Sequence, residues 1–576
     1  MRVLATAGHV DHGKSSLVLA LTGTDPDRFA EEKRRGLTID LGFAHTTLPS
    51  GEEISLVDVP GHVRFLRNML AGVGGVDACI FVVAATEGWK QQSEEHLRIL
   101  ELLGIRHGVI ALTKVDLVDD EWREIATLEV VAAVTGTFLE GARIIPVAAT
   151  TEQQRGLAEL IEAIDALVAE APAALDRGRA RLWVDRSFAA KGSGTIVTGT
   201  LAGGSLRHDD TVSIIDARGA RSARVRTMQR HGDTVDDVAP GNRVALNLSG
   251  IAHTDLERGA AIVHPGRWHL TDHFDAMLDV LASLDHDVSG RGAYQAYLGS
   301  LEATAKLRVL GGSAIAPGAS GAVRVFLPHA VPLLPGDRFI LRESGRDETV
   351  GGGTVLDVDP VLRAATARPD DTIERVIAER GWVEVSLLER LTGTARPPDL
   401  GHWAVAPEVL SAEQSRWWAA LDAAGDGGLD LAPLDERERA IVETLDEVTI
   451  EAGRARRADA LDPFADHPLA AAILAGGYAP EVPPGLDRAV VRELVRRSVL
   501  VEREQMLFHQ QTIEAAALLA AELLVDLPEG FTVSQFRERT GASRKWAVPL
   551  LAELDHRGVT RRRDDLRVAG PRLPDV

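Results

Sequence analysis

The chain has 576 residues, with 63 Lys and Arg against 85 Asp and Glu, and a formal net charge of −22 at pH 7. This length exceeds what one hydrophobic core supports, so we expect several domains. The single cysteine, Cys79, excludes disulfides within the chain and a cysteine zinc site, and we expect it to be a core residue. No signal peptide or membrane span is visible in the sequence, which predicts a cytoplasmic protein with no membrane partner.

The first motif is a phosphate-binding loop near the N-terminus. GHVDHGKS fits the pattern G-x-x-x-x-G-K-[ST] and follows the apolar segment 3–7. Between a strand and a helix, the backbone N–H groups of this loop surround phosphates, its lysine reaches the β and γ phosphoryl oxygens, and its serine binds Mg²⁺. The expected nucleotide-binding residues are Gly8, His9, Val10, Asp11, His12, Gly13, Lys14, Ser15 and Ser16.

Two segments downstream complete the phosphate site. RGLTID offers a threonine in a charged stretch suited to a switch, and the strand EISLVD ends in a carboxylate that is followed by VPGH. In some P-loop nucleoside triphosphatases a glutamine after this strand orients the attacking water. We therefore expect Mg²⁺ to be held by Ser15, Thr38 and Asp58, the γ-phosphate to be sensed at Gly61, and the water to be positioned by His62.

A further motif, TKVD at 113–116, is expected to bind the base. The Asp116 carboxylate can accept hydrogen bonds from guanine N1–H and N2–H, a pattern that adenine does not offer, and the stem of Lys114 can pack over the ring. Ala148 and Ala149 follow a strand ending in Pro-Val, where a backbone N–H can meet guanine O6. The ordered set predicts a GTPase rather than an ATPase.

These motifs together resemble the GTP-binding domain of translational GTPases, the elongation factor Tu branch in particular. GHVDHGKS, RGLTIDLG, DVPGH and TKVD occur in the order of that branch. Two positions depart from it: Thr113 stands where most relatives have Asn, and Ala148-Ala149 stand where they have Ser-Ala. The resemblance implies GTP and GDP as ligands, with Mg²⁺, and the departures imply weaker nucleotide binding.

Hydrophobic patterning divides the chain into domains. Strand and helix patterns alternate at first and predict a doubly wound parallel sheet. Two series of short β runs with glycine turns then predict two antiparallel barrels, and the last 200-odd residues become helical. The expected divisions are 1–172 for the GTP-binding domain, 178–266 and 267–366 for the barrels, 367–509 for winged-helix spacer units, and 510–576 for a C-terminal winged helix.

The C-terminal segment is basic in an acidic chain. From 531 to 576 ten Arg or Lys stand against six acids, a net charge of +4. The sequence predicts a helix, a turn, a second helix with a basic start and a β-hairpin wing, which together form a winged helix. The spacer has no comparable basic face, and its segment 383–392 predicts a helix–turn–helix. The expected RNA-binding residues are Arg544, Lys545, Trp546, Arg561, Arg562 and Arg563; the alternative is an interaction module with solvated arginines.

A body of this kind followed by winged helices resembles the bacterial selenocysteine-specific elongation factor. RLWVDR, GTIVTGTL and PGNRVALNL fit its second domain, PGDRFILR fits its third, and SRKWA fits its last winged helix. The resemblance implies a monomer that carries selenocysteinyl-tRNA to the ribosome at UGA codons marked by an mRNA hairpin, with hydrolysis of GTP. It also implies a selenocysteine pocket at Asp185, Arg186 and Arg243.

Charge explains why arginines suit such a pocket. A selenol is ionised at neutral pH, whereas serine is not and cysteine mostly is not, so a fixed positive charge can select selenocysteine. The alternative for these residues is an Asp–Arg pair on a barrel surface with an unrelated arginine beside it.

Four other functions share parts of these features. They are a general aminoacyl-tRNA carrier, a sulfate-activation GTPase, a tRNA-binding initiation factor, and a winged-helix regulator fused to a GTPase. The first has no use for the C-terminal 200 residues, and the second lacks a basic winged helix. The third commonly has a cysteine zinc knuckle, which Cys79 alone cannot form, and the fourth does not require two barrels.

Overall fold

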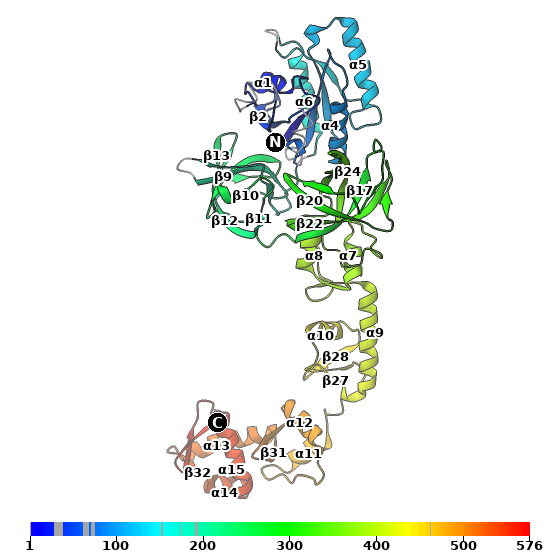
Figure 1. Ribbon diagram of the computed structural model, residues 1–576. Coiled ribbons are helices and arrows are strands. Elements are labelled where there is room, and N and C mark those ends of the chain that lie inside the picture. Colours follow the sequence, from blue (N-terminus) through cyan, green and yellow to red (C-terminus); the bar gives the residue numbers. More distant parts are fainter. Residues whose placement is uncertain are drawn as a thin grey trace. The chain divides into compact units, whose positions relative to one another are not determined.

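The computed structural model describes residues 2–27, 38–61, 68–70, 75–150, 154–172, 174–190, 194–460 and 462–575. They form two compact units, Met1–Ala406 and Pro407–Val576 (Figure 1). None of the helices in these ranges is long and apolar enough to span a membrane. The expected catalytic residue His62 lies outside the described residues.

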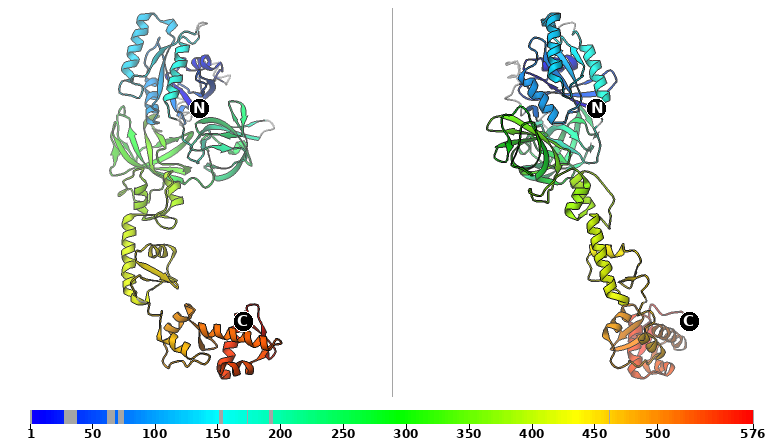
Figure 2. Two further views of the ribbon diagram at one scale, coloured as in Figure 1. Left: turned by 180° about the vertical axis from the view of Figure 1, so that it is seen from behind. Right: turned by 90° about the vertical axis from the view of Figure 1, so that its right-hand side faces the viewer.

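The N-terminal domain is a doubly wound sheet, as predicted, with helices on both of its faces (Figure 2). Its strand order is β2-β3-β1-β4-β5-β6. All neighbours are parallel except β2 and β3. Every residue of β4, including Cys79, is buried, because helices cover both faces of the sheet. The strands are β1 (Arg2–Ala7), β2 (Gly42–Thr47), β3 (Glu53–Asp58), β4 (Ala78–Ala84), β5 (Gly108–Thr113) and β6 (Ile144–Pro146).

Two helices cover each face of this sheet. One face packs on α1 (Lys14–Thr22) and α6 (Leu157–Glu170), and the other on α4 (Gln91–Leu102) and α5 (Asp120–Val134). A 3₁₀ turn, η2 (Val115–Leu117), follows β5. Since the carboxyl ends of parallel strands meet at one edge, the loops after β1, β3 and β5 converge there, where α/β proteins bind ligands.

The second domain is a barrel of six strands in the order β11-β16-β7-β9-β15-β12. The barrel closes because β11 also pairs with β12. Burial alternates along β15, so every second side chain points outward, Arg243 among them. The strands are β7 (Arg181–Trp183), β8 (Arg186–Ala190), β9 (Gly194–Ala202), β10 (Leu206–Arg207), β11 (Thr211–Asp216), β12 (Gly219–Arg230), β13 (Asp233–Val235), β14 (Asp237–Val238), β15 (Asn242–Ser249) and β16 (Ala261–Val263), with the 3₁₀ turn η3 (His253–Asp255).

The third domain is a closed barrel in the order β17-β22-β20-β19-β23-β24. The two barrels confirm the predicted fold class for this part of the chain. The strands are β17 (Leu270–Val280), β18 (Val288–Ser289), β19 (Tyr294–Leu298), β20 (Leu301–Val309), β21 (Ala314–Ile315), β22 (Ser320–Pro332), β23 (Arg338–Glu343) and β24 (Glu348–Asp357).

A small helical unit follows the second barrel and corrects one prediction. It contains α7 (Ile373–Arg380), β25 (Trp382–Glu384), α8 (Val385–Thr392) and β26 (Trp403–Val405). The helix–turn–helix predicted at 383–392 is wrong, because Val383 and Glu384 lie in a strand paired with β26 and only 385–392 is helical. Tryptophan and β-branched valine favour an extended backbone once Gly381 (φ 71°) has ended α7.

The second compact unit ends in a complete winged helix. Its sheet has the order β32-β34-β33, and α13, α14 and α15 enclose a common core with Phe531 and Phe536. Its elements are α13 (Gln510–Asp526), β32 (Phe531–Thr532), α14 (Val533–Thr540), α15 (Arg544–His556), β33 (Thr560–Arg563) and β34 (Leu566–Ala569).

Shorter helix-and-hairpin elements precede that winged helix in the same unit. Two hairpins pack against short helices, and the second of them reaches the start of α13. The elements are α9 (Pro407–Ala424), η4 (Gly425–Gly427), β27 (Leu429–Asp430), α10 (Glu436–Glu443), β28 (Val448–Glu451), β29 (Arg454–Arg457), α11 (Pro468–Ala475), α12 (Arg488–Arg496), β30 (Leu500–Arg503) and β31 (Met506–His509).

Candidate functional site

The phosphate-binding loop curls because its backbone adopts conformations that favour glycine. Gly8 has φ 132° and Gly13 has φ 85°, and Asp11 between them has φ 60°. A Cβ on Gly8 would lie 2.1 Å from the carbonyl oxygen of Val82, so no other residue fits there. Such a curl directs successive N–H groups inward, which is the arrangement that binds anions.

Lys14 lies inside this curl. Its Nζ donates to the carbonyl oxygens of Gly8 at 3.0 Å and His9 at 2.7 Å, and the side chain is buried. Burial lowers the pKa of Lys14 to about 8, although Asp58 opposes the shift. Gly61 packs so closely against Lys14 that a Cβ on Gly61 would lie 2.4 Å from the Lys14 Nζ. The ammonium therefore lies inside the loop, where the motif predicts that it contacts phosphate.

Two residues of α4 hold the same loop, and the sequence motifs do not reveal them. His96 Nδ1 accepts from the Gly8 N–H at 3.1 Å, and Gln92 Oε1 accepts from the Val10 N–H at 3.2 Å. Burial lowers the pKa of His96 to about 3, so its ring is neutral and can accept. Gln92 and His96 are four residues apart, which places both on one face of a helix. This spacing is the only sign in the sequence that the two residues act together.

The three expected Mg²⁺ ligands meet at the start of α1. Ser15 Oγ lies 2.8 Å from Thr38 Oγ1 and donates to Asp58 Oδ2 at 2.7 Å. Thr6 Oγ1 donates to the other carboxylate oxygen at 2.7 Å. Burial raises the pKa of Asp58 against these hydrogen bonds and the charge of Lys14. Two hydroxyls and a carboxylate are the oxygen donors that Mg²⁺ prefers, so the residues fit the ion.

The predicted base-binding residues lie after β5 and β6. Thr113 Oγ1 donates to the carbonyl oxygen of His12 at 2.6 Å, so the threonine ties this loop to the phosphate-binding loop. Lys114 has φ 57° and lies within 3.4 Å of Glu87, and Asp116 is exposed. Ala148 is buried, Ala149 is half-buried, and the exposed Ser16 lies on α1.

On the first barrel, Asp185 and Arg243 form a bidentate ion pair. Arg243 Nη1 and Nη2 lie 2.5 and 3.0 Å from the two oxygens of Asp185, and Thr198 Oγ1 donates to the same carboxylate at 2.6 Å. Both charged side chains are more than four-fifths buried, with 13% and 6% exposed. The pair is therefore fixed in place, unlike an ordinary surface ion pair.

Residues of the GTP-binding domain contact this pair and its neighbour Arg186. The Phe43 ring centroid lies 3.4 Å from the Arg243 guanidinium and 4.5 Å from that of Arg186. Asp40 lies 3.8 Å from Arg186 and 2.8 Å from Arg258, which also contacts the backbone of Asp185. The sequence motifs predict neither Phe43 nor Arg258, because both contacts cross between domains.

The predicted RNA-binding residues are on the surface of the last winged helix. Arg544 and Lys545 are exposed at the start of α15, and Trp546 is half-buried with Lys545 Nζ 5.2 Å from its ring centroid. Arg561, Arg562 and Arg563 are exposed on β33. Because side chains alternate along a strand, Arg561 and Arg563 share one face and Arg562 points to the other.

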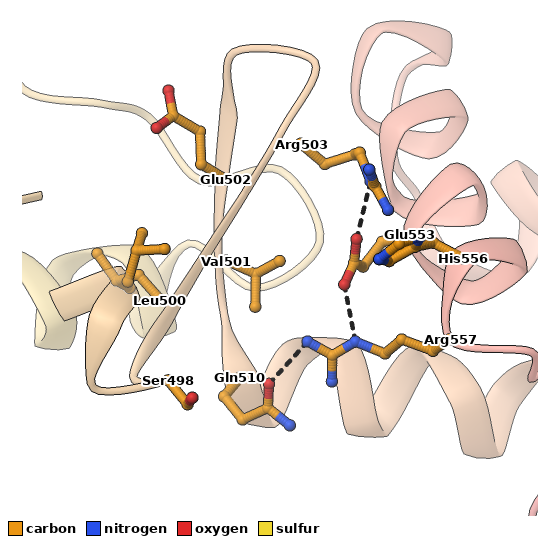
Figure 3. Close-up of a pocket in the computed structure, with 10 residues that line it drawn as sticks. Ser498, Leu500, Val501, Glu502, Arg503, Gln510, Glu553, His556 and Arg557 are labelled. Carbon is orange, nitrogen blue, oxygen red and sulfur yellow. Dashed lines mark hydrogen bonds and ion pairs between the residues drawn. The ribbon is translucent and has the colours of Figure 1, made fainter. Parts of the chain in front are cut away.

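A cavity of about 500 Å³ lies beside this winged helix. Arg503 of β30 and Arg557, just past α15, approach Glu553 from two sides, each at 2.8 Å, and Arg557 also donates to Gln510 (Figure 3). The lining includes none of the expected nucleotide-binding or RNA-binding residues. These contacts join the preceding hairpin, β30–β31, to α15, which we call the recognition helix.

Three family models match parts of the chain. Residues 1–170 match the elongation factor Tu GTP-binding domain. Residues 275–361 match the β-barrel domain of the selenocysteine-specific elongation factor, and residues 522–569 match the winged helix of elongation factor SelB. The order of the three matches is the order of the domains in the structure.

Curated proteins and a solved structure agree with these matches. The selenocysteine-specific elongation factor of Desulfomicrobium baculatum is 41% identical over 354 residues, 62% of this chain and 55% of that protein. That of Escherichia coli K12 is 38% identical over 270 residues, 47% and 42% of the two chains, so this chain spans about half the length of the curated relatives it matches.

The crystal structure of a bacterial selenocysteine-specific elongation factor, EF-Sec, superposes with a TM-score of 0.72 at 26% identity and covers 99% of both chains. The SelB structure from Methanococcus maripaludis with the GTP analogue GppNHp is 24% identical, covers 62% of this chain and 80% of that one with a TM-score of 0.52, and shares the fold. The comparisons confirm the fold class and the family resemblance predicted from the motifs.

Proposed function

We propose that the chain, a relative of the bacterial selenocysteine-specific elongation factors, is a GTP-dependent carrier of selenocysteinyl-tRNA. The observation that carries this proposal is the fixed Asp185–Arg243 pair, with Arg186 beside it, where the first barrel meets the GTP-binding domain. The carrier delivers its tRNA to the ribosome at UGA codons marked by an mRNA hairpin, and it works as a monomer. Its activity, substrate and partners rest on this proposal, because the curated matches cover about half of those proteins.

The GTP-binding domain supplies the switch. The phosphate-binding loop and Lys14 bind the phosphates, and Asp116 with the Ala149 N–H selects guanine over adenine. Ser15, Thr38 and Asp58 would hold Mg²⁺, and the bound ion would neutralise negative charge on the phosphate groups. Thr38 Oγ1 lies 2.8 Å from Ser15 Oγ, so its segment is placed to respond to the γ-phosphate. His62 orients the attacking water.

Selection of selenocysteine follows from charge. The aspartates and arginines around the pocket are Asp40, Asp185, Arg186, Arg243 and Arg258, a net positive set. Arginine stays protonated at every physiological pH, so the pocket favours a selenolate over a neutral hydroxyl or thiol. A charge-assisted contact of about 1.5–3 kcal/mol corresponds to roughly a ten- to a hundredfold preference over serine on the same tRNA.

The last winged helix holds the mRNA hairpin. The exposed Arg544 and Lys545 lie at the N-terminus of α15, where the helix dipole adds to the attraction for phosphate. Sequence in RNA is read at splayed loop bases, on which the half-buried Trp546 or a wing arginine can stack. A body that binds tRNA and a winged helix that binds mRNA together account for the GTP-binding domain, the two barrels and the C-terminal winged helix.

The test is the substitution Arg243→Ala. The variant is expected to lose the preference for selenocysteinyl-tRNA over the same tRNA charged with serine, while seryl-tRNA affinity stays unchanged. Equilibrium binding with a non-hydrolysable GTP analogue measures both affinities. Arg243→Lys is the matched control: it keeps a charge without the bidentate geometry and should retain part of the preference. An undiminished preference in Arg243→Ala would disprove the charge pocket.

A further inference from the structure

The phenyl ring of Phe43 covers the guanidinium groups of both pocket arginines. Its centroid lies 3.4 Å from the Arg243 guanidinium carbon and 4.5 Å from that of Arg186. Phe43 is half-buried and also packs against the core of the GTP-binding domain. The ring is therefore held from behind by one domain and presents its face to the other.

The contact is part of a wider connection between the two domains. Asp40 pairs with Arg258 at 2.8 Å, and Arg186 donates to the carbonyl oxygen of Leu41. Arg258 in turn donates to Asn68 at 2.8 Å and to the backbone of Asp185 at 3.0 Å. The segment 40–43 thus contacts the pocket through a carboxylate, a carbonyl oxygen and a ring.

The same segment leads directly to the Mg²⁺ ligands. Gly42 is paired with Asp58 in the β2–β3 ladder, and a Cβ on Gly42 would lie 3.1 Å from the Asp58 Cβ. Thr38, two residues before Asp40, contacts Ser15. One short stretch of chain therefore contacts the magnesium ligands at one end and the pocket arginines at the other.

We propose that Phe43, supplied by the GTP-binding domain, is a specificity-determining residue of the selenocysteine pocket. The proposal rests on the proposed function above. The ring excludes water from the faces of the two guanidinium groups and fixes their planes, while Asp185 and the Leu41 carbonyl oxygen hold part of their N–H edges. With less water nearby, the attraction between a guanidinium and a selenolate is less screened, whereas a neutral serine gains little.

The experiment compares Phe43→Ala with Phe43→Leu. The affinities for selenocysteinyl-tRNA and for seryl-tRNA on the same tRNA are measured with a GTP analogue, using the full chain. We expect the preference for selenocysteine to fall about fivefold or more in the alanine variant, with seryl-tRNA affinity within about twofold of wild type. Leucine keeps an apolar cover of similar volume and should restore most of the preference.

A third variant covers the case in which alanine disturbs the domain. GDP affinity reports whether the GTP-binding domain is intact. If Phe43→Ala binds GDP poorly, Phe43→Gln replaces it in the comparison, because glutamine fills the same space with a polar side chain. The glutamine variant should lose the preference for selenocysteinyl-tRNA that Phe43→Leu retains. An unchanged preference in the variant that binds GDP normally, or an equal loss for both tRNAs, overturns the proposal. A wild-type chain with no preference for selenocysteine contradicts the proposed function instead.

Discussion

Burial sets the charge state of the side chains that hold the phosphate-binding loop. His96 and His12 are both buried, and burial lowers the pKa of each to about 3. Burial lowers the pKa of Lys14 to about 8. This value is close enough to neutral pH for a bound ligand to change how fully the side chain is protonated. The neutral ring of His96 can accept the Gly8 N–H, whereas its protonated form could not.

The pKa of Lys14 predicts that nucleotide affinity depends on pH. Phosphate favours the protonated ammonium, so binding above pH 8 must take up a proton. The affinity for GDP should then fall as pH rises through 8, approaching roughly a tenfold loss per pH unit. Titration of GDP binding between pH 7 and 9.5 measures this. Lys14→Arg cannot lose its proton and should remove the dependence, apart from any ionisation of the nucleotide; a flat profile in the wild type would contradict the prediction.

The pKa of His96 predicts a loss of stability in mild acid. Above the unfolded-state value of 6.5 both states are neutral and the full stability is present. As pH falls below 6.5 only the unfolded chain takes up the proton, which costs the folded state about 1.4 kcal/mol per pH unit until about pH 3. His96→Gln keeps a hydrogen-bond acceptor that does not titrate. The dependence of its free energy of unfolding on pH should therefore lack the contribution of one proton.

Hydrogen exchange of the β1 and β4 amides between pH 7 and 5, corrected for the intrinsic exchange rate, measures the stability of this domain in the wild type and in His96→Gln. The contribution of His12 is present in both proteins and cancels. Identical slopes in the two proteins would show that His96 does not titrate between the folded and unfolded states.

At the scale of elements, the wing of the last winged helix is anchored on the recognition helix. Asp555 of α15 accepts from Thr560 at 2.6 Å and from Arg567 at 2.8 Å. Thr560 is the first residue of β33, and Arg567 lies in β34. Arg567 is buried, so this arginine is structural, whereas Arg561 and Arg563 are exposed. Basic residues of the wing thus divide into one that holds the fold and others that are exposed to solvent.

The exposed pair at the start of α15 leads to a prediction about RNA. Arg544→Ala combined with Lys545→Ala should remove binding of the mRNA hairpin and leave GTP hydrolysis unchanged, because neither side chain is buried in the winged-helix core. Gel-shift titration at two salt concentrations measures the affinity and its salt slope, and Arg416→Ala, an exposed arginine of α9, is the matched control. If the double variant still binds the hairpin with wild-type affinity, Arg544 and Lys545 are solvated surface residues and do not bind RNA.

The elements also show what the sequence could and could not predict. The phosphate-binding loop was predictable because one contiguous segment, 8–15, supplies most of its chemistry through backbone N–H groups. The roles of Gln92, His96 and Phe43 were not, because each depends on which helix or strand packs beside it. The prediction at 383–392 failed for a local reason, since one turn of helix and a short strand have similar hydrophobic patterns.

At the scale of the whole molecule, charge is distributed unevenly. The chain has a net charge of −22, yet the C-terminal segment 531–576 is basic. An acidic body repels nucleic acid at long range, so binding should concentrate where basic residues are grouped, as at the proposed pocket on the first barrel and on the wing. Two separate RNA contacts, one for tRNA and one for mRNA, are consistent with this distribution.

The proposed switch connects the proposed Mg²⁺ site and pocket through one segment. Thr38 contacts Ser15, and the chain from Thr38 to Phe43 reaches the pocket arginines. Thr38→Ala should therefore weaken aminoacyl-tRNA binding in the GTP state and have little effect in the GDP state, as measured by tRNA affinity with each nucleotide. A variant that binds GDP normally and loses tRNA affinity equally in both states would contradict the link.

The most direct measurement of the central claim is a comparison of four affinities. Selenocysteinyl-tRNA and the same tRNA charged with serine are each titrated against the full chain, with a non-hydrolysable GTP analogue and with GDP. A carrier that reads both charge and nucleotide should bind tightly only when selenocysteine and the GTP analogue are present together, by roughly ten- to a hundredfold over serine. Equal affinity for the two aminoacyl groups, or equal affinity with the two nucleotides, would contradict it.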